Sequence, residues 1–435
     1  MDVSTLTLII LFGLIGLIAI GVPLGFASGF LGAVIVYLKI GPSGMGILLA
    51  RMYSLVVTYS FLSVPLFIFM ASLLERSNIA RDLYDALNAW LKKTRGGVAV
   101  VTAIMATIMA AMSGIIGGEI VLLGLIALPQ MLRLKYDQDL AIGVICASGS
   151  LGTMIPPSIV LIIYGLVTST SITLLFKEAF LPGLILSGLI ISYILIRTRL
   201  KPSLAPIDEN EPGLTFKEKL KYLPGFLPPV IVVVVVLGSI YGGITGITEA
   251  AGMGCMATLF LIFIRKELNW FLFKDSITRT FKATGTIITI TFGATVLAGA
   301  YSLIGGPTYV ANLILGLDVA PMFVIALMML IFLVLGAFMD WVGIVLLTMP
   351  VFLPIVLKLG FDPIWFGILF CVNMQVSFLS PPFGPAAFYL KSVAPPHITL
   401  IEIFRGFGPF ICLQIIVLLL VMFFPGITQT FHTFG

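Results

Sequence analysis

The chain of 435 residues is 60% hydrophobic and only 10% charged, with a formal net charge of +5. Soluble globular proteins carry about 25% charged residues, so this composition excludes a soluble domain and predicts an all-α polytopic membrane protein. The positive charge is then expected to report how the chain is oriented in the bilayer, and no nucleic-acid partner is expected.

Ten apolar segments are predicted to be membrane spans because of their length and composition. They are residues 4–22, 24–39, 55–75, 139–168, 176–196, 224–241, 249–264, 283–300, 364–390 and 402–424. Of the 24 Lys and Arg residues, 20 fall on one side of the membrane if segments 76–95, 197–221 and 265–282 face the cytoplasm. Because Lys and Arg concentrate in cytoplasmic loops, we expect this orientation, with both termini on the periplasmic side.

Two early stretches predict helix packing and a surface helix. GFASG at 25–29 has small residues four apart, a spacing typical of closely packed membrane helices. Segment 76–95 places Leu83, Leu87 and Trp90 on one side and charged residues on the other. This pattern predicts an amphipathic arm helix that lies in the membrane surface.

Residues 96–132 are apolar but have basic residues at both ends. The chain must therefore return to the side that it left. Each of two equal arms would reach about 25 Å, whereas the hydrocarbon core is about 30 Å thick. These lengths favour a re-entrant helical hairpin with its tip at SGIIGGE, residues 113–119; two short tilted spans are the alternative.

The span predicted at 139–168 is interrupted by SGSLGTMIPPSIV at 148–160. Glycines and prolines there free backbone carbonyls, which lipid tolerates only when they are buried or line a cavity. With the nearby hydroxyls they predict a cluster of hard oxygens that suits a dehydrated Na⁺, and the half-helix that begins after the break suits an anion. The residues concerned are Ser148, Gly149, Ser150, Gly152, Thr153 and Ser158.

A shift of 225 residues aligns the chain with itself without a gap. Pro129 falls on Pro354, Asp137 on Asp362, and Pro156-Pro157 on Pro381-Pro382. Segment 76–95 is basic whereas its counterpart 301–320 has no Lys or Arg, so the two copies are predicted to face opposite sides. Such an inverted-topology repeat is typical of secondary transporters.

The second copy predicts a hairpin over 321–357, with its tip near Asp340, and a break in NMQVSFLSPPFGPAAF at 373–388. The positions that this second break offers are Asn373, Gln375, Ser377, Ser380 and Gly384. Asp340 is an ionisable group at membrane depth, which makes it a candidate to bind a cation or substrate, and a helix cap is the alternative.

The repeat also predicts a division into scaffold and transport regions. Scaffold helices are expected at 1–75, 224–300 and 392–435, arms at 76–95 and 301–320, transport halves at 96–175 and 321–391, and a scaffold helix with a cytoplasmic linker at 176–223. The predicted fold is therefore an inverted repeat with about ten spanning helices and two re-entrant helical hairpins.

Four motifs resemble the large membrane subunit of tripartite ATP-independent periplasmic (TRAP) transporters. They are VPLFIFMASLLERS (64–77), the SGIIGGE tip, ASGSLGTMIPPSIVLIIYG (147–165) and LSPPFG (379–384). The resemblance implies an elevator-type carrier of the ion transporter superfamily in the bacterial inner membrane, which imports an organic acid with Na⁺. A C4-dicarboxylate, sialic acid or a sugar acid would be the substrate. The implied partners are a separate small four-helix membrane subunit and a periplasmic substrate-binding protein.

The resemblance places the cation sites where each hairpin tip meets a broken helix. The cation-binding residues that it implies are Ser113, Gly149, Ser150, Gly152, Thr153, Pro156, Asp340, Gln375, Ser377 and Ser380. The predicted substrate-binding residues are Ser148, Ser158, Asn373 and Gly384. Na⁺ is the coupling ion, and no cofactor is expected.

Two other functions fit a broken-helix membrane protein. A stand-alone Na⁺-coupled anion carrier and an ion channel stay as alternatives, because broken helices also line selectivity filters. An enzyme is not expected, since no catalytic His/Asp/Cys cluster or nucleophile elbow lies at membrane depth. The four cysteines are predicted to be buried small hydrophobes.

Overall fold

The computed structural model describes residues 2–91, 93–114, 117–207, 214–316 and 319–429. Parts of five predicted regions lie outside the described residues. They are 92 in the first arm and 115–116 in the first tip, 208–213 in the linker, 317–318 in the second arm and 430–435 at the C-terminus. Within the described ranges all regular secondary structure is helical, as the composition predicts.

The helices fall into two halves joined by a linker. The first half contains α1 (Val3–Ala19), α2 (Leu24–Ile40), α3 (Pro42–Val56), α4 (Ser63–Arg76), α5 (Ile79–Leu91), α6 (Gly97–Ser113), α7 (Gly118–Arg133), α8 (Gln138–Gly149), α9 (Ile159–Thr168) and α10 (Ile172–Leu200). After the linker helix α11 (Phe216–Lys221), the second half contains α12 (Leu227–Tyr241), α13 (Ile247–Ile264), α14 (Trp270–Leu303), α15 (Gly306–Leu315), α16 (Pro321–Gly336), α17 (Trp341–Lys358), α18 (Pro363–Leu379), α19 (Pro385–Lys391) and α20 (Leu400–Phe423). Short 3₁₀ turns include η1 (Tyr59–Leu62), η2 (Leu151–Thr153) and η4 (Leu223–Phe226).

The helix bounds reproduce the 225-residue register. α7 and α17 end at Arg133 and Lys358, and α8 and α18 begin directly after Asp137 and Asp362. Both aspartates cap their helices, because the Asp137 carboxylate accepts from the Leu140 N–H and that of Asp362 from the Ile364 N–H, each at 3.0 Å. The register also extends further than the sequence identities, since α1 and α2 correspond to α12 and α13.

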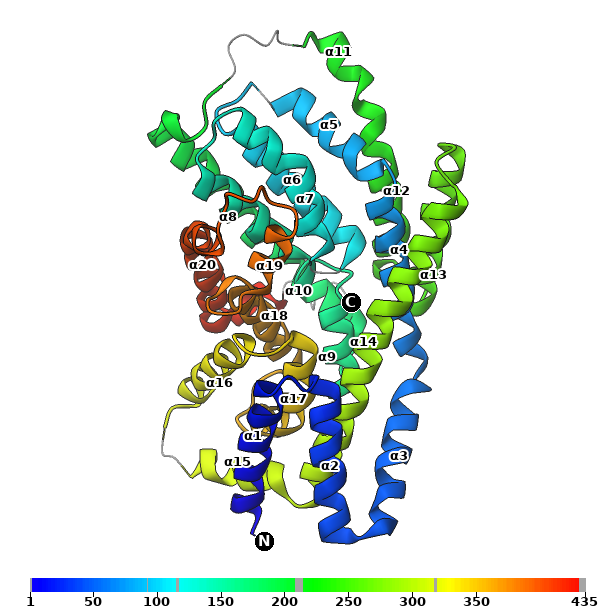
Figure 1. Ribbon diagram of the computed structural model, residues 1–435, viewed down its shortest axis with the longest axis vertical. Coiled ribbons are helices and arrows are strands. Elements are labelled where there is room, and N and C mark those ends of the chain that lie inside the picture. The colour runs from blue at the N-terminus through cyan, green and yellow to red at the C-terminus, as the bar shows by residue number, and fades with distance from the viewer. Residues whose placement is uncertain (1, 92, 115–116, 208–213, 317–318, 430–435) are drawn as a thin grey trace.

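The two halves lie in opposite senses along the molecule. The first hairpin, α6 and α7, is near one end of the long axis, and the second, α16 and α17, is toward the other (Figure 1). The arm helices α5 and α15 are separated in the same way. The basic helix α11 and the α13–α14 turn lie at one end and the N-terminus at the other, an arrangement that agrees with the predicted charge asymmetry.

Within the described residues, seven helical stretches are long and apolar enough to cross a membrane. Six of these stretches correspond to predicted spans, and the seventh is α17, which was predicted as a hairpin arm. α1 and α2 have 17 residues each, and the spans predicted at 139–168 and 364–390 are the broken pairs α8–α9 and α18–α19. The predicted total of ten therefore depends on how shorter and broken helices are counted.

Two helical segments lie outside the predicted spans. α3 forms between the spans predicted at 24–39 and 55–75, with Pro42 at its first position. α14 begins at Trp270, so the span predicted at 283–300 is part of a 34-residue helix that also contains most of the basic segment 265–282. The prediction of a close-packing face on α2 is confirmed, because a Cβ at Gly25 would stand 2.6 Å from the Thr289 carbonyl oxygen of α14.

Each hairpin packs against the broken helix of the other half. α9 lies against α17, and α19 lies against α7. The two broken helices also meet, because the Tyr164 hydroxyl on α9 donates to the Pro363 carbonyl at 2.5 Å and its ring stacks on Phe370. The segment predicted as the first arm forms the helix α5, whose Leu83 and Leu87 are buried against the protein, while its place in the membrane surface stays a prediction.

Candidate functional site

The first hairpin tip lies directly on the first break. Gly114 ends α6 in the left-handed region at φ +60°, and an added Cβ there would meet the Pro157 carbonyl. The Ile159 N–H donates to the Gly114 carbonyl at 3.4 Å. Ser113 donates its hydroxyl to the carboxylate of Glu119, which closes the tip from within.

The first break begins at a position where the broken helix packs closely against the first hairpin. α8 ends at Gly149, and a Cβ at this position would stand 2.6 Å from Cγ1 of Ile120 on α7. The chain then makes the 3₁₀ turn η2, which contains Gly152, and passes Pro156 before α9 begins. Glycine at 149 therefore permits close packing between the hairpin and the broken helix.

Three hydroxyls in the first break donate to carbonyls of the break itself. Ser150 donates to Ala147 at 2.8 Å, Thr153 to Ser150 at 3.0 Å, and Ser158 to Thr153 at 2.6 Å. A hydroxyl whose proton is used in this way keeps its oxygen lone pairs available, which is the state that binds a cation. Ser158 also caps α9. The N–H groups at the start of α9 were predicted to bind an anion, but here the Leu161 N–H donates to the Ser158 hydroxyl and the Ile159 N–H donates to the Gly114 carbonyl.

Gln414 is a further polar residue of this region that the sequence did not single out. Its side-chain amide donates to the Ser150 hydroxyl at 3.2 Å, while its Oε1 has no partner among the described residues. The buried Ser148 hydroxyl likewise has no partner in the described part of the chain. The sequence signal for Gln414 was a polar amide side chain within the otherwise apolar helix α20, because polar side chains at membrane depth are rare unless they have a structural or functional role.

The second break differs from the first in its backbone. α18 remains helical to Leu379, so Asn373, Gln375 and Ser377 lie on an intact helix, and only residues 380–384 leave helical geometry. Ser380 donates back to the Val376 carbonyl at 2.7 Å, and the Gly384 N–H donates to the Ser380 carbonyl at 3.0 Å. Among the polar residues predicted for the second break, only Ser380 and Gly384 therefore lie within the non-helical segment.

Several buried polar atoms on α18 have no hydrogen-bond partner within the described ranges. Both amide atoms of Gln375, the Ser377 hydroxyl and Oδ1 of Asn373 are in this state. The Asn373 amide nitrogen donates to the Met329 carbonyl on α16 at 2.8 Å. A buried polar group without a partner costs about 1–3 kcal/mol, so this cluster is chemically fitted to a polar ligand.

The second tip and α18 enclose a small cavity. Gly336, Asp340 and Ser377 are among its lining residues, and its volume of about 10 Å³ admits roughly one water-sized particle. The Asp340 carboxylate accepts from the Val342 N–H at 3.3 Å and so caps α17. The structure thus brings Asp340 and Ser377 to one cavity, whereas Gln375 does not line it and Ser380 donates back into its own helix.

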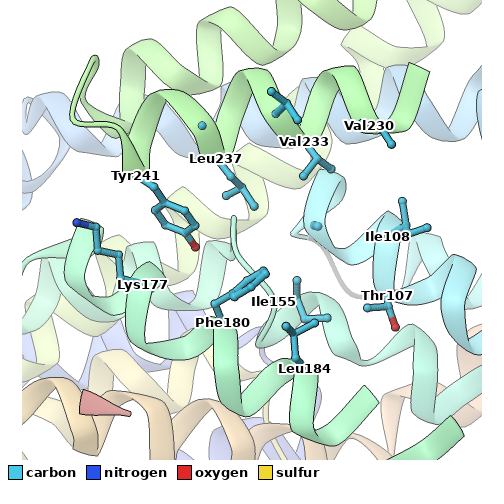
Figure 2. Close-up of a pocket in the computed structure, with 13 residues that line it drawn as sticks. Thr107, Ile108, Ile155, Lys177, Phe180, Leu184, Val230, Val233, Leu237 and Tyr241 are labelled. Carbon is cyan, nitrogen blue, oxygen red and sulfur yellow. The ribbon is translucent and has the colours of Figure 1, made fainter. Parts of the chain in front are cut away.

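A second, larger cavity has a different character. It has a volume of about 710 Å³ and lies between α6, α10 and α12 beside Ile155, with almost entirely apolar side chains around it (Figure 2). Within the described residues, its lining contains none of the predicted site residues. Apart from Lys177, Thr107 and Tyr241 the lining is apolar, so an ionised organic acid would lose most of its hydration there for few polar contacts, and the cavity fits the predicted anion site poorly.

The four cysteines are free thiols. Cys146, Cys255 and Cys371 are buried as predicted. Cys412 is exposed, so the prediction was wrong at that position.

Paired helical hairpins, each against a broken helix rich in hydroxyls and carbonyls, define this molecule as a multi-pass membrane transport protein. The sequence profile described as "Tripartite ATP-independent periplasmic transporter, DctM component" matches residues 11–427. The chain belongs to this family, whose members are the large membrane subunits of TRAP transporters.

Curated relatives agree with this assignment. The C4-dicarboxylate TRAP transporter large permease protein DctM of Pseudomonas aeruginosa is 29% identical over 404 residues, 92% of each chain. The sialic acid TRAP transporter large permease protein SiaM of Vibrio cholerae is 28% identical, covering 96% of each chain. The ectoine/5-hydroxyectoine large permease protein UehC of Ruegeria pomeroyi is 30% identical over 85% of each chain. These relatives are transporter permeases rather than enzymes.

The fold also resembles a transporter outside this sequence family. The crystal structure of the Alcanivorax borkumensis YdaH transporter aligns with a TM-score of 0.64, covering 93% of this chain and 97% of that chain. Its sequence is only 13% identical, so the similarity concerns the fold alone.

Proposed function

We propose that this chain is the large membrane subunit of a Na⁺-driven importer for a small organic acid. One observation carries the proposal: in each half, a hairpin tip lies against a helix break at which hydroxyls, carbonyls or unpartnered amides are buried. Broken helices of this kind bind coupling ions and anionic substrates in secondary transporters.

Two Na⁺ sites would follow from the two tips. The first would use the carbonyls and hydroxyls around Gly149, Ser150, Gly152, Thr153 and Pro156, with Ser113 at the tip. The second would use the Asp340 carboxylate with Ser377, whose buried hydroxyl has no partner among the described residues. Gln375 is also predicted to bind this ion, but it does not line the cavity that Asp340 and Ser377 share, so it would have to turn toward it. The Ser380 hydroxyl could join only after leaving its bond to Val376.

The substrate would bind between the sites, at Ser148, Ser158, Asn373 and Gly384. An anion at the start of α9 would replace the hydrogen bond between the Ile159 N–H and the Gly114 carbonyl. Substrate binding would then loosen the first tip from its break. The C4-dicarboxylate and sialic acid in the names of two relatives support an organic acid as the cargo.

The remaining assignments follow the family. The chain would lie in the bacterial inner membrane with both termini periplasmic, beside a small four-helix membrane subunit and fed by a periplasmic binding protein. The hairpins and broken helices would move as an elevator against a scaffold that includes α2 and α14, whose close glycine packing supports a rigid frame.

Reconstitution into proteoliposomes tests the proposal. With the small subunit and the binding protein present, we expect uptake of one labelled organic acid from a panel under an inward Na⁺ gradient, and none under an equal K⁺ gradient. Uptake without the binding protein would instead identify a stand-alone carrier. Unitary currents in planar bilayers would identify a channel.

A further inference from the structure

We propose that the 710 Å³ cavity between α6, α10 and α12 is a binding site for one acyl chain of a phospholipid, with Lys177 contacting the lipid phosphate. The volume lies within the range of about 300–1,000 Å³ that is typical of ligand sites. This proposal concerns lipid binding and does not depend on the proposed transport function.

The lining of this cavity has its hydroxyl groups already satisfied. The Tyr241 hydroxyl donates to the Phe176 carbonyl at 3.1 Å, and the hydroxyls of Thr107 and Ser187 are 2.6 Å apart. The side chains between them are aliphatic or aromatic. A guest therefore needs no hydrogen-bonding groups along most of its length, which fits a hydrocarbon chain and not a hydrated solute.

The charge of the cavity is confined to one end. Lys177 lies at the same end as Tyr241, and Thr107 and Ile108 lie at the other (Figure 2). Within the described part of the chain, no carboxylate forms an ion pair with Lys177. An apolar cavity with a lysine at one end matches a molecule that has an anionic head and an apolar tail. The aliphatic part of a lysine side chain packs on hydrocarbon, while its ammonium group reaches the polar headgroup region of the bilayer.

The cavity is also open to the surface that the bilayer covers. Val230 and Val234 on α12 are 50% and 61% exposed, and Leu184 on α10 is 40% exposed. α10 and the helical stretch Phe216–Tyr241, which contains α12, are long and apolar enough to span the membrane. A lipid can therefore enter sideways from the bilayer, without crossing any polar part of the protein.

Gly238 offers a way to fill the cavity. It lines the site, and a Cβ there would meet no atom closer than 3.8 Å, so a larger side chain has room. Gly252 on α13 is the matched control, because a Cβ at that position meets nothing within 4 Å and the residue lies outside the cavity lining. Lys358 is a control lysine near the end of α17, also outside the lining.

Native mass spectrometry of the purified chain, released from nanodiscs of palmitoyl-oleoyl phosphatidylglycerol and phosphatidylethanolamine, tests the site. We expect one retained phospholipid per chain. Gly238→Phe should reduce retention about tenfold or more, since excluding even two methylene groups costs about that factor, whereas Gly252→Phe should not. Lys177→Met should weaken retention about fivefold, and Lys358→Met should leave it unchanged.

Photolabelling of the unmodified chain gives a second readout that requires no variant. Phosphatidylglycerol with a diazirine in its acyl chain should label peptides from α10 and α12. Equal retention by Gly238→Phe and the unmodified chain would overturn the proposal. Labelling confined to other helices would do the same, as would cross-linking of a co-purifying polypeptide at α12.

Discussion

The two helix breaks of this protein occupy equivalent positions but supply their polar atoms differently. In the first, the backbone leaves helical geometry over 150–158, and hydroxyls donate to the freed carbonyls. In the second, the helix stays intact through Leu379, and the unpartnered atoms belong to the side chains of Gln375 and Ser377. The two repeats therefore share the position of the helix break but differ in the polar groups that lie beside it.

This difference separates two ways of building a polar site in a membrane. The first break is largely self-satisfied, so it is stable without a ligand and can offer main-chain oxygens. The second break leaves buried groups unpaired, at a cost of about 1–3 kcal/mol for each. A cation bound beside Asp340 would give the Ser377 hydroxyl a partner that the described residues do not provide.

The largest effect is expected when Gly149 in the first break is replaced by the residue found at the equivalent position of the second break. Gly149 corresponds to Met374, and Gly149→Met would drive a side chain into Ile120. We expect destabilisation of about 3 kcal/mol and loss of uptake, because overpacking typically costs about 1–3 kcal/mol and the tip would also be displaced. Thermal unfolding in detergent measures the loss. Gly252→Met is the control, and equal stability of the two variants would contradict the close approach.

A gain of stability is expected in the second break. Gln375→Met replaces two unpartnered amide atoms with an apolar group of similar size, so it should stabilise the Na⁺-free protein by about 1–3 kcal/mol and lower uptake. Gln414→Met is the matched control and should destabilise, because the Gln414 amide donates to Ser150. Unfolding in choline chloride distinguishes them. A lower melting temperature for Gln375→Met would show that its amide has partners.

Asp340 tests whether the charge or the cap matters. Asn caps helices as well as Asp, so Asp340→Asn should keep the fold while raising the Na⁺ concentration for half-maximal uptake about tenfold or more. Asp362→Asn is the control, since Asp362 caps α18 in a similar way. Unchanged Na⁺ activation in Asp340→Asn would leave Asp340 as a structural cap.

The smallest effect is expected at positions where the halves are alike. Asp137→Ala and Asp362→Ala each remove one cap and should each cost about 1 kcal/mol. Chemical denaturation of the two variants under identical conditions compares them. A difference of more than about twofold would mean that one aspartate has a second role.

The parts of the fold that could be predicted are those that short stretches of the sequence encode. Basic residues at both ends of 96–132 indicate a hairpin, and the paired prolines mark both breaks. α3 was missed because Arg51 and several glycines resemble a connection between spans, yet packing against α14 keeps the segment helical.

The parts of the site that escaped prediction depend on distant partners. Gln414 meets Ser150 across 264 residues, a pairing that no local pattern encodes. α18 stays helical through three polar residues while Asn373 donates to α16, so the second break begins only at Ser380, directly before its paired prolines, whereas the first begins at Ser150, well before its own.

The crosswise packing of α9 on α17 and of α19 on α7 has a consequence for how the molecule is divided. Neither repeat alone encloses a whole binding region, because the wall behind each tip comes from the opposite repeat. A polypeptide cut in the linker near residue 210 would yield two incomplete pieces, which could form the paired tip-and-break regions only by inserting in opposite directions and reassociating.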